Sequence, residues 1–144
     1  MKFLKFAFLL GIFGVIFTSC LGDNRGDNVM YGYLATTKIE QKEIKPVGES
    51  SKLSITYTTT NTCQAFVQFQ LVKNADNVIE LGVVGSQKTG DGCTDKVEDK
   101  IVEYPFTPTK AGIYTFRFWA GKNSDNTDKF IEEKVEIKAL EPAK

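Results

Sequence analysis

Apolar residues recur at every second position through most of this chain, and this alternation limits the fold more than any other feature. The clearest example runs from Leu53 to Tyr57, where Ser54 and Thr56 separate the apolar residues. The same pattern recurs at residues 63–71, 79–83, 102–106, 114–120 and 131–137, with a weaker one near 39–44. Because successive side chains of a strand point to opposite faces, the pattern predicts half-buried β-strands.

The segments between these strands are rich in turn-forming residues, at 46–48, 74–77, 85–92, 108–112 and 121–128. No segment of useful length repeats its apolar residues with the period of 3.6 expected for a helix. Short, regularly spaced strands without helices are typical of sandwiches and barrels. The sequence therefore predicts an all-β chain, with an antiparallel β-sandwich of about seven strands over residues 35–141.

The stretch from Phe106 to Phe118 resembles the corner between strands E and F of an immunoglobulin-like sandwich. In that fold a tyrosine near the start of strand F hydrogen-bonds back to the preceding turn, a position that Tyr114 takes here. In this lettering strand C begins near Cys63, strand F near Ile113 and strand G near Phe130. The resemblance implies that strand F lies between strands C and G and runs antiparallel to both. It concerns topology and carries no function.

A candidate binding surface follows from the phase of the alternation. With Tyr114, Phe116 and Phe118 inward, Arg117 and Trp119 point outward. With Cys63, Ala65, Val67, Phe69 and Leu71 inward, strand C presents its remaining side chains outward. The immunoglobulin-like strand order then predicts one outward group, which consists of Phe66, Gln68, Arg117, Trp119 and Phe130. Exposed aromatic residues ringed by polar groups mark binding sites. The alternative is that residues Val29 to Leu34 fold back and cover the group.

The amino terminus has the organisation of an export signal. Lys2 and Lys5 precede an apolar run from Phe6 to Phe17, and small residues follow. The run is shorter than the roughly 20 apolar residues of a membrane-spanning helix. Residues 1–19 are therefore predicted to be a signal peptide, and residues 20–34 a tether that precedes the domain.

Thr18-Ser19-Cys20 resembles the lipobox of bacterial lipoproteins, in which a small residue precedes the cysteine that becomes the lipidated N-terminus. The resemblance implies that Cys20 carries two acyl chains and holds the chain to a membrane. Stable anchoring needs more than one acyl chain, and two chains meet that need. Leu21 stands where an aspartate would favour inner-membrane retention. The resemblance thus implies the outer membrane or the cell surface. An ordinary secretory signal with an incidental cysteine is the alternative.

The chain has three cysteines. If Cys20 carries lipid, Cys63 and Cys93 remain as a pair in an oxidising compartment, where a disulfide is the expected state. Two free thiols, or half of a metal site, are the weaker alternative.

The sequence contains no histidine, which excludes Ser-His-Asp and Cys-His catalysis and the histidine-containing zinc sites. No catalytic residue, metal site or cofactor is predicted. The 18 basic and 18 acidic residues balance, so nothing points to nucleic acid.

The favoured function is a non-enzymatic binding module that meets a glycan, a peptide or an envelope protein. Two alternatives remain at this point: an inhibitor lipoprotein that inserts a loop into a lysozyme or protease, and a lipocalin-like carrier of a small ligand.

Overall fold

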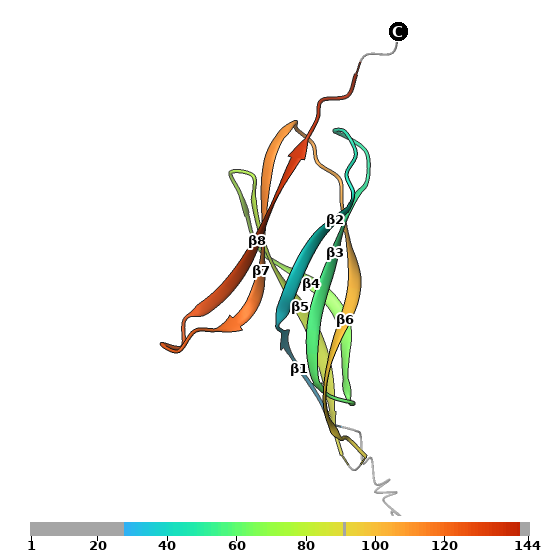
Figure 1. Cartoon of the computed structure of the whole chain (residues 1–144), viewed down its shortest axis with the longest axis vertical. Coiled ribbons are helices and arrows are strands. Elements are labelled where there is room, and N and C mark those ends of the chain that lie inside the picture. Colours follow the sequence, from blue (N-terminus) through green and yellow to red (C-terminus); the bar gives the residue numbers. More distant parts are fainter. Residues whose placement is uncertain (1–27, 91, 142–144) are drawn as a thin grey trace, which may run out of the picture.

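A computed structural model describes residues 28–90 and 92–141 of the protein. The predicted signal peptide, the predicted lipidation site Cys20 and the first part of the predicted tether lie outside these residues. Among the described residues no helix could cross a membrane. The predicted all-β class is confirmed, with eight strands in two sheets (Figure 1). The strands are β1 (Asn28–Leu34), β2 (Thr36–Glu43), β3 (Ser51–Asn61), β4 (Gln64–Ala75), β5 (Val78–Thr89), β6 (Asp95–Phe106), β7 (Gly112–Lys122) and β8 (Asp128–Ile137).

The larger sheet has five strands, and β5 lies at its centre. One side of β5 pairs with β4, and the other side pairs first with β7 and then with β1. The pairing of β5 with β7 is parallel, whereas the other pairings are antiparallel. This order differs from the immunoglobulin-like expectation, because β5 and not β4 lies beside β7. Strand β4, the first strand of the β4–β5 hairpin, therefore lies at the outer edge of the sheet.

Strand β1 belongs to the folded domain, although the sequence reading placed it in the tether. Its seven residues pair with β5 in an unbroken register from Asn28 opposite Thr89 to Leu34 opposite Val83. After Ala35 the chain crosses to the smaller sheet, whose order is β2-β3-β6. The side chains on either side of this crossing, Leu34 and Thr36, are both buried. Residues 28–34 are therefore part of the folded domain.

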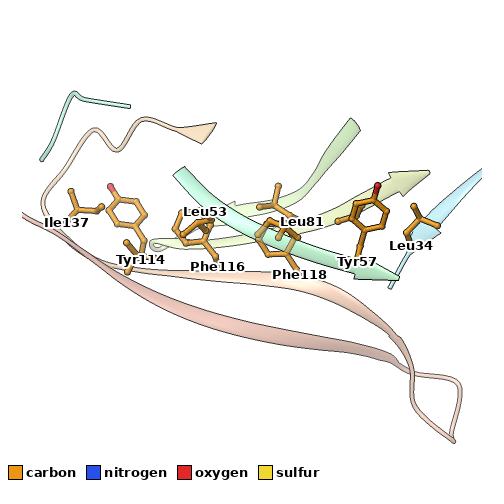
Figure 2. Packing of buried hydrophobic residues seen from close by; sticks show 11 residues of the cluster. Leu34, Leu53, Tyr57, Leu81, Tyr114, Phe116, Phe118 and Ile137 are labelled. Carbon is orange, nitrogen blue, oxygen red and sulfur yellow. The ribbon is translucent and has the colours of Figure 1, made fainter. Parts of the chain in front are cut away.

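The core lies between the two sheets and contains the inward residues that the alternation predicts on β3 and β7, together with buried residues of β1, β5 and β8. Figure 2 shows these side chains in a row that runs from Ile137 at one end to Leu34 at the other. Phe116 and Phe118 are fully buried. The hydroxyl of Tyr114 donates a hydrogen bond of 3.0 Å to the carbonyl oxygen of Lys110, which is the corner contact that the sequence predicts.

The predicted disulfide is present between Cys63 and Cys93, whose Cα atoms are 5.4 Å apart. It links the turn between β3 and β4 to the loop between β5 and β6 at one end of the sandwich. Strand β1 starts at this same end, because Asn28 lies opposite Thr89.

Candidate functional site

Four aromatic side chains lie on the outer face of the larger sheet and form what we call the aromatic face: Tyr31, Tyr33, Trp119 and Phe130. Trp119 and Phe130 face each other across β7 and β8, one position beyond the buried Phe118. The ring centroids of Tyr33 and Trp119 are 5.6 Å apart, with the planes tilted by 45°. The aromatic face thus begins near the middle of the sheet and continues along β1.

The aromatic face exists because β7 and β1 pair with successive parts of the same side of β5. Strand β7 pairs with β5 only from Val78 to Leu81, and β1 pairs with it only from Val83 onward. At the changeover lies Gly82, and the ring of Tyr33 occupies the position that a side chain there would need. Because Gly82 has no side chain, the Tyr33 ring can occupy this position and contact Trp119.

Hydrogen bonds fix the orientation of Trp119. Its indole Nε1 donates to Oδ1 of Asp128 at 2.8 Å, and Nζ of Lys122 lies 2.7 Å from the same oxygen. These two donors, Lys122 more than Trp119, lower the pKa of the Asp128 carboxyl below its ordinary value. The carboxylate is therefore the ionised partner of both groups at neutral pH.

Arg117 contacts the ring of Phe130 on the same face of the sheet. Its guanidinium carbon lies 4.7 Å from the centre of the Phe130 ring, within the range of a cation–π contact. Its Nε and Nη1 atoms are each 2.7 Å from a carboxylate oxygen, of Glu132 and Glu80 respectively. The charges around the aromatic rings are thus paired with one another.

The structure brings Arg117, Trp119 and Phe130 together as the sequence predicts, and it excludes Phe66. The expected outward position of Phe66 is wrong, because a β-bulge between Phe66 and Gln68 reverses the alternation in the middle of β4. Phe66 points into the core, with its ring centroid 5.1 Å from that of Phe69. Val67, expected inside, is exposed as the bulged residue.

Gln68 lies on the outer face as expected, one strand away from the aromatic rings. Val84 on β5 stands opposite both Gln68 and Tyr33. Gln70, two positions after Gln68 on β4, lines a shallow pocket of about 200 Å³. The other residues around this pocket are Tyr31, Gly32, Tyr33 and Val84. Amide side chains therefore border the aromatic face on the β4 side.

Tyr31 and Tyr33 were not among the predicted site residues, because the segment that holds them was assigned to the tether. The short apolar run from Val29 to Leu34, which contains a β-branched residue and two tyrosines, was the signal that could have identified a strand. The alternative was that residues Val29 to Leu34 fold back over the outward group, and the structure shows a different arrangement. The segment joins the sheet at its edge, and only the Tyr33 ring extends over its neighbours.

Comparisons with known proteins add no identity to this site. The chain matches no protein-family description, and no curated protein or solved structure matches it. In the part of the chain that the structure describes, no three acidic or cysteine side chains gather closely enough to hold a metal ion.

Proposed function

We propose that the protein is a lipid-anchored, non-enzymatic binding module that presents its aromatic face to an uncharged glycan. The observation that carries the proposal is the exposure of the rings: Tyr31 is 68% exposed and Tyr33 is 40% exposed, beside the oriented indole of Trp119. Large exposed aromatic side chains combine apolar contact area with a polar group, as binding sites require.

The charges on this face favour a neutral ligand. Arg117 is held by two carboxylates, and Lys122 is held by Asp128. An anionic or cationic ligand would have to break these pairs, whereas a sugar ring can place its C–H face on an aromatic ring. Its hydroxyl groups can then reach the amide groups of Gln68 and Gln70 at the border of the face.

Anchoring by lipid on Cys20 remains part of the proposal. Seven residues separate Cys20 from Asn28, and a fully extended chain spans at most about 3.6 Å per residue. The disulfide end, where β1 starts, would then lie within roughly 30 Å of the membrane. Growth with a fatty-acid analogue should label the wild-type chain and leave Cys20→Ala unlabelled; label that persists in the variant contradicts the anchor.

The sequence offers a direct probe of the aromatic face, since Trp119 is the only tryptophan. We expect the emission of the full-length protein to change in a saturable way when a neutral polysaccharide binds, with soluble β-glucan, starch and mannan as probes. Tyr31→Ala should abolish the response without a loss of folding. Ile101→Ala is the matched control, because Ile101 is exposed on the other sheet. A response that survives Tyr31→Ala, or none with any of the three glycans, contradicts the proposal.

The two other functions from the sequence receive no specific support. A lipocalin-like carrier needs a cavity for its ligand, whereas the space between these sheets is filled by the aromatic core. A lysozyme or protease inhibitor would act through a loop end, and tight stoichiometric inhibition would identify it.

A further inference from the structure

Strand β1 differs from the other outer strands of the described residues in having no charged residue, no proline and no bulge. An exposed edge attracts another strand unless charges, proline or bulges prevent it. Strands β2 and β4 each contain two register shifts, β6 carries charged residues and Pro105, and β8 carries several Lys and Glu residues. Strand β1 has the sequence NVMYGYL, which contains no charge and no proline, and its register is continuous.

The unprotected edge of β1 is open among the described residues. Within residues 28–90 and 92–141, β1 pairs only with β5. Strand β7, on the same side of β5, pairs with it no farther than Leu81 opposite Phe118. Along β1 the side chains of Met30 and Tyr31 are 56% and 68% exposed. Both the backbone edge and its side chains are therefore available for contact.

The inner face of β1 contains a notch. Gly32 stands opposite Gly85, and the side chain of Leu34 fills the space over Gly85, so the open space lies over Gly32. Met30 and Leu34 flank the gap, which is part of a pocket of about 260 Å³ that Gln64 and Gln87 also line. A Cβ atom built on Gly32 would meet nothing within 4 Å. The notch is thus large enough to receive a side chain from a neighbouring strand.

We propose that a second copy of the protein adds to this edge, with the two β1 strands antiparallel and the two-fold axis at Tyr31. In this register Met30 stands opposite Gly32 of the partner subunit, so each copy places its methionine over the notch of the other. Val29 then faces Tyr33 of the partner subunit, a favourable pair of β-branched and aromatic residues. A two-fold interface repeats each contact, and the absence of charge means that no like charges meet.

The dimer would join the two aromatic faces. The two-fold axis of an antiparallel pair stands perpendicular to the sheet, so both outer faces lie on the same side. Tyr31 would lie beside Tyr31 of the partner subunit at the centre of one continuous surface. One added strand is a small interface, and confinement of two anchored copies to one membrane would raise their effective concentration. This last step rests on the proposed lipid anchor.

Cysteine cross-linking tests the register directly. Residues that face each other across an antiparallel pair have Cα atoms about 4.5–5.5 Å apart, which suits a disulfide. We expect Tyr31→Cys, expressed as the full chain in a bacterial envelope and oxidised in whole cells, to run at twice the monomer mass without reductant. Val97→Cys is the matched control, since Val97 is 75% exposed on an edge strand of the other sheet. Co-expressed Met30→Cys and Gly32→Cys chains should also cross-link with each other.

A second variant separates loss of the dimer from loss of the fold. Gly32→Val fills the notch with a side chain that the monomer has room for, so the dimer should be lost while the unfolding midpoint is not lowered. A monomeric Tyr31→Cys chain, a cross-link to a different protein, equal cross-linking of Val97→Cys, or an unchanged dimer in Gly32→Val would overturn the proposal. Fatty-acid labelling of the same cells reports the anchor, and glycan titration reports the binding function, so each can fail separately.

Discussion

The aromatic ring of Tyr33 lies in the space that a side chain on Gly82 would occupy. This relationship connects β1 to the centre of the larger sheet at the point where β7 leaves β5. It also places Tyr33 within ring contact of Trp119. The aromatic face therefore depends on a residue that has no side chain.

Gly82→Ala should destabilise the domain, because the added methyl group must displace the Tyr33 ring. Overpacking of this kind costs about 1–3 kcal/mol, and the partial exposure of Tyr33 favours the lower part of that range. Urea unfolding measures the loss, and the emission of Trp119 should shift as its neighbour moves. Gly32→Ala is the matched control, because its Cβ would enter open space. Equal stability of the two variants would contradict this account.

Phe66→Ala should affect stability and not binding. The Phe66 ring packs against Phe69 and Tyr57 in the core, with centroids 5.1 Å and 6.2 Å away. Since Phe66 is only partly buried, we expect a cost near the lower end of the roughly 3–5 kcal/mol typical of Phe→Ala. Calorimetry and glycan titration on the same sample separate the two effects. Weaker glycan binding in a variant of unchanged stability would return Phe66 to the binding surface.

Removal of the disulfide should lower the free energy of unfolding without altering the fold. Cys63 and Cys93 are separated by 30 positions, and closure of a loop of that size contributes about 3–4 kcal/mol on the chain-entropy model. Cys63→Ser with Cys93→Ser should lower the urea midpoint accordingly. Reductant should lower the midpoint of the wild-type protein and leave that of the double variant unchanged. A midpoint in wild type that does not respond to reductant would show that the bond is absent.

The emission of Trp119 should depend on pH through Asp128. Lys122 and the indole N–H lower the pKa of this carboxyl in the folded state. The ionised carboxylate therefore stabilises the fold above the unfolded-state pKa of about 3.9, and the contribution is lost as pH falls through the folded-state value. We expect an emission transition with a midpoint below about 3.9, absent in Asp128→Asn. A midpoint above that value, or a transition that persists in the variant, would contradict the assignment.

The alternation of residues was sufficient to predict the strands whose register is regular. On β7 the buried Tyr114, Phe116 and Phe118 fix the phase, and Arg117 and Trp119 consequently point outward as expected. The corner hydrogen bond of Tyr114 follows from the same segment. The disulfide follows from the number of cysteines and from their positions at one end of the sandwich.

The features that the sequence did not reveal depend on long-range pairing. The bulge at Val67 shifts the phase of β4 by one residue, and nothing in the local alternation marks it. Strand β5 takes the place beside β7 that was expected for β4. This exchange leaves the alternation of apolar residues within each strand unchanged. The position of β1 is settled by a distant partner, since Leu34 pairs with Val83, 49 positions away, and Asn28 pairs with Thr89, 61 positions away.

The crossing of the chain between the two sheets at Ala35 has a mechanical consequence. A load applied at Asn28 along the strand axis would strain all seven register pairs of β1 with β5 together, as in shear, and would not open them one after another. Beyond these pairs, the buried side chains of Leu34 and Thr36 secure the chain where it changes sheets. The pairing of β1 with β5 is therefore arranged to resist a pull along the strand axis, as the proposed lipid anchor would apply at Asn28.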